Sequence, residues 1–207
     1  EPGELRKSSF LKKRVDACAE YRRNAPMKGD AYRHRATPWL FRDDHQPSMN
    51  YLAIPKVFSE DREYMTCDWY TPDIIAGDMV YTSPVIESRM FMTWQQTIGG
   101  RLESRCRFSN TVVWNNLPLP ALDDETRTAL IEAGRNVLVA RANHPGQSLA
   151  DLYDPDYMPT DLRAAHRELD KVADVAFGAR KWLKDDDDAR LQVLFKSYTH
   201  MTGSSEV

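Results

Sequence analysis

Apolar residues recur at helical spacing at both ends of the chain. Residues 8–23 form one amphipathic pattern, with Ser8 or Ser9 available as the N-cap. A connector with alternating prolines, 117–120, precedes the second helical part. Three more helices are predicted there: from the acidic start at 123–125 to His144, from Pro159 to about Gly178, and after the acidic run 185–188.

The pattern between Pro38 and Pro120 is different, because short aromatic and β-branched runs alternate with proline and glycine. Such runs are typical of strands in a mixed or antiparallel sheet. The predicted strands are 51–55, 62–70, 78–82, 104–109 and 111–115. One helix of about four turns should separate the third and fourth strands, with Ser83 as its N-cap and Gly99-Gly100 ending it.

These patterns predict an α+β fold. A small mixed or antiparallel sheet with helices should occupy residues 1–118, and an all-α helical domain should follow over residues 119–207. The strongest sequence feature within the first part is 101–108, where strict alternation would place Arg101, Glu103, Arg105 and Arg107 on one face of a single strand.

Composition excludes several classes of protein. The 207 residues carry 28 Lys and Arg against 31 Asp and Glu, and no apolar run is long enough to cross a bilayer. The start of the chain has no hydrophobic signal region. Three cysteines without Cys-x-x-Cys spacing argue against a disulfide framework and a cysteine-rich zinc site, so a cytoplasmic protein is expected.

A net charge of −3 argues at first against a nucleic-acid partner, yet the charge is unevenly distributed. Residues 1–42 hold 11 Lys and Arg against 5 Asp and Glu, a surplus of +6. Residues 43–116 hold 6 against 10, and residues 117–207 hold 11 against 16. Only the first segment has an overall electrostatic reason to approach an anion, although a solvated basic helix face explains it equally well.

Three groups that look catalytic are more simply structural. Residues 154–157, Asp-Pro-Asp-Tyr, are close to the tetrapeptide with which amino-methyltransferases hold a flipped base, but Asp replaces its second proline and no glycine-rich S-adenosylmethionine loop precedes it. Four aspartates at 185–188 are expected to start a helix. The five histidines lack metal-binding spacing, and His166 should be a hydrogen-bonded core residue. We therefore expect no catalytic residue in this chain.

The charged face at 101–107 has a chemical use. Arginine donates two parallel hydrogen bonds to guanine and glutamate accepts one from cytosine, so Glu103 and Arg105 together could read one C·G pair. The alternative is a solvated ladder in which Glu103 pairs with its neighbouring arginines.

Four segments carry a resemblance to a known family. They are PWLF (38–41), YLAIPKVFSEDREY (51–64), GRLESRCRFSNTVVWNNLPLP (100–120) and LYDPDYMPTDLRAAHRELDKVADVAFG (152–178). In this order they resemble the C-terminal part of the MmeI-like (type IIL) restriction–modification enzymes and their adenine methyltransferase relatives. The resemblance implies a DNA target recognition domain followed by a helical C-terminal domain.

The resemblance also implies that the chain is part of a longer enzyme. That parent would carry a nuclease module and an S-adenosylmethionine-dependent methyltransferase domain acting on adenine N6, with Mg²⁺ needed for cleavage. The expected partners of the chain are double-stranded DNA and the methyltransferase domain of the same polypeptide. No cofactor is expected within these residues.

Site residues follow from the same resemblance. Glu103 and Arg105 match the pair of positions that tracks the base pair next to the target adenine, and Glu with Arg resembles the members that read C there. Candidate contacts to phosphates or neighbouring bases are Arg101 and Arg107, and weaker phosphate candidates are Lys56, Arg62 and the basic residues of the first helix.

Two other hypotheses remain open at this point. The chain could chiefly scaffold other proteins through its acidic helical half, which apolar, solvent-facing residues on the 123–144 or 159–184 helices would favour. It could also be a free-standing specificity subunit that lacks its own catalytic domain.

Overall fold

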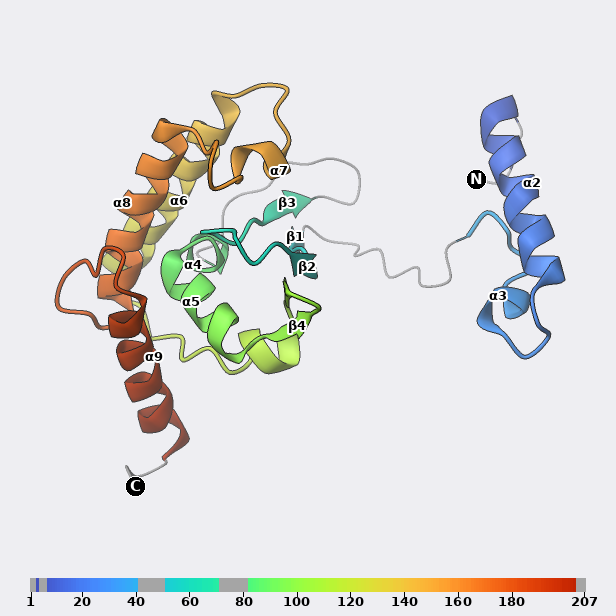
Figure 1. Ribbon diagram of the computed structural model, residues 1–207. Coiled ribbons are helices and arrows are strands. Elements are labelled where there is room, and N and C mark those ends of the chain that lie inside the picture. Colours follow the sequence, from blue (N-terminus) through green and yellow to red (C-terminus); the bar gives the residue numbers. More distant parts are fainter. Residues whose placement is uncertain (1–2, 4–6, 41–50, 71–81, 204–207) are drawn as a thin grey trace. The chain divides into compact units, whose positions relative to one another are not determined.

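The computed structural model of the chain describes residues 3, 7–40, 51–70 and 82–203. Contacts between residues divide the chain into two compact units, 1–48 and 49–207. Figure 1 shows both units. No described helix is long and apolar enough to span a membrane.

The first unit consists of helix α2 (Ser9–Asn24) and the short helix α3 (Asp30–Arg33). The Ser8 hydroxyl accepts a hydrogen bond from the Leu11 amide at 3.4 Å, which confirms the predicted helix and its N-cap. No residue of either helix is buried. The unit therefore has little core of its own to stabilise it.

Arg22 organises the loop that follows these helices. Its guanidinium donates hydrogen bonds to the carbonyls of His34, Thr37 and Leu40, at 3.0, 2.7 and 2.8 Å. A guanidinium engaged in this way holds the 34–40 segment against α2 and has few donors left for a phosphate.

The second unit contains two small antiparallel sheets. Strand β1 (Tyr51–Ala53) pairs with β3 (Asp68–Tyr70), and a second sheet has the order β2-β5-β4. The strands of the second sheet are β2 (Val57–Phe58), β4 (Gly100–Leu102) and β5 (Arg105–Arg107). The predicted α+β class with a small antiparallel sheet is confirmed.

Several predicted strands are wrong in extent or type. Of the predicted strand 62–70 only residues 68–70 are extended, and residues 111–115 fall mainly in the π-helix η1 (Asn110–Trp114). The Ser109 hydroxyl caps η1 through the Val112 amide, and the Val113 carbonyl accepts a hydrogen bond from the Trp94 indole at 3.0 Å. These contacts override the β-propensity of the valines. Most of the predicted strand 78–82 lies outside the described residues.

The predicted four-turn helix is interrupted. Helix α4 (Thr82–Ile86) ends before Ser88, and α5 (Arg89–Ile98) begins after it. The Ser88 hydroxyl accepts from the Phe91 amide and donates to the Val85 carbonyl at 2.6 Å, so Ser88 caps the second helix while Ser83 does not cap the first. Gly99 ends α5, as predicted.

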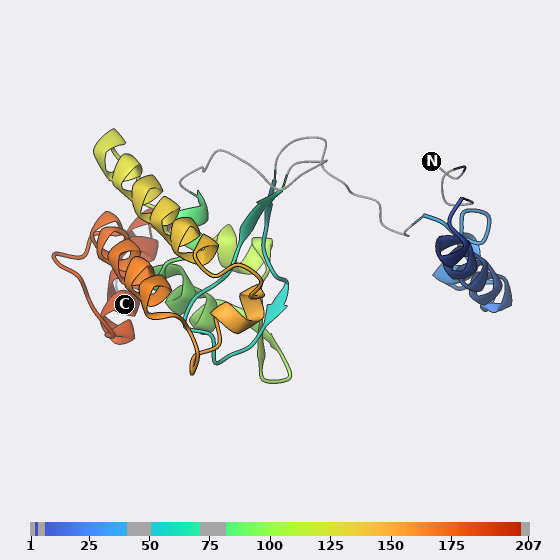
Figure 2. The ribbon, with the colours of Figure 1, turned by 90° about the horizontal axis from the view of Figure 1, so that it is seen from above.

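Of the remaining helices, the three long ones lie on the side of the unit away from the β4–β5 hairpin in both ribbon views, whereas the short helix at 149–152 lies nearer the strands (Figures 1 and 2). They are α6 (Asp124–Ala142), α7 (Leu149–Leu152), α8 (Thr160–Ala176) and α9 (Asp187–Thr202). The three long helices confirm the sequence predictions, and Asp123, in the acidic start that was predicted, is the N-cap of α6. The one-turn α7 was not predicted.

Helix α5 joins the sheet to these helices. Every residue from Met90 to Gln95 is buried. The Trp94 ring packs against Phe195 and Tyr198 of α9, with centroids 5.7 and 5.9 Å apart. Phe91 packs in the other direction, against Phe108 and Trp114. One apolar core therefore extends from the β5 end of the sheet to the last helix.

A buried ion pair connects distant segments within this unit. Arg141 of α6 is paired with Glu87, whose side chain is fully buried. Arg141 also donates to the Tyr153 hydroxyl at 2.7 Å and to the Cys67 carbonyl at 3.1 Å. Tyr153 in turn bonds His166 at 2.7 Å, which confirms His166 as a hydrogen-bonded core residue.

Removal of the Arg141 side chain should be strongly destabilising, because it leaves Glu87 buried without its cation. We expect Arg141→Leu to lower the free energy of unfolding by about 3 to 5 kcal/mol, measured by urea denaturation. The matched control is Arg135→Leu, at an exposed position of the same helix, which should change stability by less than about 1 kcal/mol. Equal effects of the two substitutions would contradict the assigned role.

Asp170 of α8 should make stability depend on pH. Burial raises its pKa to about 7, although the Tyr64 hydroxyl and the Arg89 amide both donate to it. The folded protein then binds a proton that the unfolded chain has already lost, so stability falls as pH rises from about 4 through 7.

The asparagine side chain of the Asp170→Asn variant does not ionise, so this variant should lack the fall in stability with rising pH. Between pH 5 and pH 8 the wild type is expected to lose about 2 to 3 kcal/mol of unfolding free energy relative to the variant. Urea denaturation at both pH values measures the difference, with the exposed Asp185→Asn as control. Parallel curves for wild type and Asp170→Asn would show that Asp170 is already ionised in the fold at pH 5.

Candidate functional site

The charged segment 101–107 forms a hairpin, not the single strand that its alternation predicted. Strands β4 and β5 pair with Leu102 opposite Arg105, so only Glu103 and Ser104 form the turn. Glu103 has a φ of 58°, in the left-handed region. Two-residue turns between antiparallel strands require such a φ, and glycine or asparagine usually provides it. The absence of those residues hides the turn from sequence reasoning.

The reversal changes which side chains share a face. Arg101 is paired with Cys106, whereas Arg107 is paired with Gly100. Because side chains alternate along each strand, Arg105 and Arg107 share one face and Arg101 lies on the other. Arg101 donates to the Ser104 carbonyl at 3.0 Å and lies 3.8 Å from the Cys106 sulfur. The predicted face of four charged side chains is therefore wrong.

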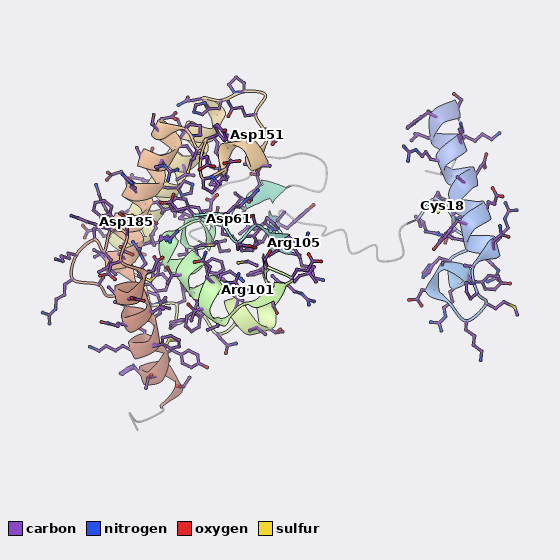
Figure 3. All side chains as sticks on the ribbon, in the orientation of Figure 1. Cys18, Asp61, Arg101, Arg105, Asp151 and Asp185 are labelled. Atoms are coloured by element: carbon purple, nitrogen blue, oxygen red, sulfur yellow. The ribbon has the colours of Figure 1, made fainter. Side chains whose placement is uncertain are left out.

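Glu103 and Arg105 nevertheless lie side by side. The Arg105 guanidinium donates to the Glu103 carboxylate at 2.8 Å, and the two side chains are 50% and 77% exposed. Such an exposed pair contributes at most about 1 kcal/mol to stability. It leaves a carboxylate acceptor and several guanidinium donors facing solvent, which is the set of groups that a C·G base pair complements. Figure 3 shows Arg105 on the hairpin side of the unit and Asp185 on the side of the C-terminal helices.

A concavity of about 760 Å³ adjoins the base of the hairpin. We call it the basic concavity, because Lys56 and Arg107 line it and none of its other described lining residues is charged. Ser109 and Asn110, at the start of η1, add a hydroxyl and an amide. Lys56 and Arg107 are thus brought together as candidate anion contacts. The sequence did not suggest Ser109 and Asn110 as site residues, because they fall at the end of one predicted strand, 104–109, and just before the next, 111–115.

Arg62 is not part of this arrangement. It donates to the Thr66 hydroxyl at 3.1 Å and lines a separate pocket of about 580 Å³ with Asp61, Asp154 and Asp156. Burial lowers the pKa of Arg62. The surrounding carboxylates make this pocket a poor place for a phosphate.

The groups that were expected to be structural have structural partners. The Asp186 carboxylate caps α9 through the Ala189 amide at 2.9 Å, and Asp187 pairs with Arg89 at 2.5 Å. Among the described residues, no group of three or more His, Cys, Asp or Glu could hold a metal ion.

Two basic residues of the first unit, which were weaker phosphate candidates, have partners within that unit. The Arg22 guanidinium donates to backbone carbonyls, and the Arg35 guanidinium lies 4.1 Å from the centre of the Tyr32 ring.

Comparison with known proteins gives consistent matches. Residues 1–121 match the family model described as the target recognition domain of MmeI, and residues 122–205 match the model of the MmeI C-terminal domain. The chain is 30% identical, over 96% of its residues, to a protein named DNA methyltransferase A from Bacillus subtilis (strain 168).

A solved structure is similar over nearly the whole chain. It is that of the type IIL restriction–modification enzyme MmeI in complex with DNA, with a TM-score of 0.81, 31% sequence identity and 98% of this chain covered. The chain spans 23% of the length of the Bacillus subtilis protein and 28% of the MmeI chain.

The left-handed backbone at Glu103 yields a stability test. An L-residue costs about 1 to 2 kcal/mol in this conformation and glycine does not, so Glu103→Gly should raise the free energy of unfolding by up to about 1 kcal/mol. Ser104, the other turn residue, has no positive φ, and Ser104→Gly should instead lower it by about 0.5 to 1 kcal/mol. Urea denaturation of both variants is the measurement. Stabilisation by Ser104→Gly together with loss by Glu103→Gly would contradict the turn geometry.

Proposed function

The chain belongs to the family of MmeI target recognition and C-terminal domains, and from that premise we propose that it is the sequence-specific DNA recognition part of a restriction–modification enzyme. Its ligand is double-stranded DNA. The observation that carries the proposal is the exposed ion pair of Glu103 and Arg105 on the hairpin. Its carboxylate and guanidinium face solvent and match the donors and acceptors of a C·G pair.

In this proposal, Glu103 accepts a hydrogen bond from cytosine N4, and Arg105 donates to guanine O6 and N7 of the same base pair. Their mutual ion pair holds both side chains in the reading position before DNA arrives, which lowers the entropy lost on binding. Arg107 and Lys56 contact DNA beside them. Arg101, on the opposite face, and Arg62, among carboxylates, have less support as DNA contacts.

The activity of the whole protein lies beyond these residues. A methyl transfer to adenine N6 would use S-adenosylmethionine, and cleavage would use Mg²⁺, both held by a methyltransferase and a nuclease part of the same polypeptide. The name of the Bacillus subtilis relative and the lengths of both relatives support a longer parent. By itself the chain would neither methylate nor cut.

The predicted division into a recognition domain, 1–118, and a helical domain, 119–207, is part of the proposal. The two family models, which meet at residues 121 and 122, support it. A cytoplasmic location is also proposed. Three cysteines without disulfides, Cys18, Cys67 and Cys106, are in keeping with a reducing compartment.

The helical half has features that favour a second role, docking on another domain or subunit. Val139 of α6 is 61% exposed and Val175 of α8 is 55% exposed. Apolar, solvent-facing residues on these helices are the feature that a scaffolding role predicts. The two roles use different surfaces and are compatible, because the hairpin and these helices lie on different sides of the unit (Figure 2).

Exchanging the charges of the pair should change the base that is read. In the full-length protein, Glu103→Lys with Arg105→Asp keeps an ion pair but reverses its donors and acceptors, so we expect G in place of C at one position of the methylated motif. Sequencing of N6-methyladenine in DNA from cells that express each protein gives the motif directly.

The two single substitutions serve as matched controls. Glu103→Lys alone places two cations together, and Arg105→Asp alone places two carboxylates together, so each should lower methylation by at least about tenfold without a new motif. An unchanged motif with the double variant would refute the assignment of the pair. Absence of any sequence-specific methylation by the wild type would refute the proposed function as a whole.

A further inference from the structure

Gly99 and Gly100 are adjacent, where α5 ends and β4 begins, but packing requires glycine at only the first of them. At Gly99 an added Cβ would lie 2.3 Å from the Gln95 carbonyl oxygen, so the close approach of α5 excludes any larger residue. At Gly100 an added Cβ would meet nothing within 4 Å, and the backbone φ is not positive. Neither backbone strain nor packing within the described protein requires glycine at position 100.

Gly100 lies at the base of the hairpin, directly opposite Arg107, and both line the basic concavity. A glycine within a strand weakens it, and an unexplained one often marks the place where a ligand or another backbone approaches closely. The missing side chain leaves the strand accessible beside a guanidinium. This combination points to a ligand that is anionic and needs room against the sheet.

We propose that the basic concavity seats the sugar–phosphate backbone of one DNA strand, which passes close to the main chain at Gly100. The inference deepens the proposed function and rests on it. Lys56 and Arg107 supply charge for phosphates, and the Asn110 amide supplies a hydrogen-bond donor. The Asn110 side chain makes no hydrogen bond to any other described residue.

The lining of the basic concavity favours the DNA backbone over base edges. Its walls are Leu52, Ile54, Ile98, Phe108 and Val112. Apolar walls suit the carbon face of deoxyribose, and the two cations of the described lining, Lys56 and Arg107, suit phosphates. The reading pair Glu103 and Arg105 lies further along the same hairpin. A strand held at Gly100 would therefore fix the position of the DNA relative to that pair.

Filling the concavity tests the inference without removing any polar contact. In the full-length protein, Gly100→Leu places a side chain in the open space, and the expected result is DNA affinity lower by about tenfold or more, on the recognised site and on unrelated DNA alike. Fluorescence anisotropy with labelled duplexes measures both. The matched control is Ala164→Leu, at an exposed position of α8, which should bind as the wild type does.

Two further variants keep the test decisive if Gly100→Leu fails to fold. Lys56→Gln should reduce the slope of log affinity against log salt by about 1, equally on specific and unrelated DNA, as a phosphate contact does. Asn110→Ala should weaken both duplexes to a similar degree. A change of the methylated motif with either variant would assign the concavity to base reading and overturn the inference.

The outcomes separate this inference from the function on which it rests. Suppose that the double variant Glu103→Lys, Arg105→Asp alters the methylated motif, while Gly100→Leu and Lys56→Gln bind DNA as the wild type does. The proposal that the basic concavity holds the DNA backbone would then be wrong, and the proposed DNA recognition would stand. If the wild type shows no DNA binding even at low salt, both are wrong.

Discussion

The guanidinium of Arg141 connects the parts on which the candidate site depends. It bonds Glu87 between α4 and α5, the Cys67 carbonyl before β3, and Tyr153 after α7. A buried cation is tolerated only when its donors are matched, so these three segments are held in one arrangement. Helix α5 is positioned by this contact, and the hairpin follows it directly after Gly99. The position of the exposed Glu103–Arg105 pair therefore depends on an ion pair in the core.

The long helices could be predicted from the sequence because their signals are local. Ser8 and Asp123 cap α2 and α6 through amides three residues away, and apolar spacing marks the faces that pack. His166 could also be recognised, since it falls on such a face. The break at Ser88 could not, because α4 and α5 read as one continuous pattern. The tertiary contacts of Glu87 and Asp170 with their partners select the interruption.

The candidate site was predicted in its residues but not in its geometry. Glu103 and Arg105 do pair, yet the four-residue charged face required a straight strand. A turn centred on Glu103 and Ser104 has none of the glycine or asparagine that signals a hairpin, so alternation alone placed Arg101 on the wrong side. The pairing of Gly100 with Arg107 depends on the same register. No local pattern reveals that these residues, with Lys56 from the segment between β1 and β2, surround one concavity.

The net charge of −3 argued against a nucleic-acid partner because a total for the whole chain does not show where the charges lie in the fold. The 43–116 segment carries more acidic than basic residues, but two of its described carboxylates are occupied elsewhere: Glu87 is buried against Arg141, and Asp61 lies in the pocket of Arg62. Phosphate responds to the local potential, which here comes from Lys56 and Arg107. The Glu103–Arg105 pair is mostly exposed and contributes little to stability, whereas the core network contributes much. If the pair reads a base as proposed, specificity can change at the hairpin with little effect on the stability of the fold.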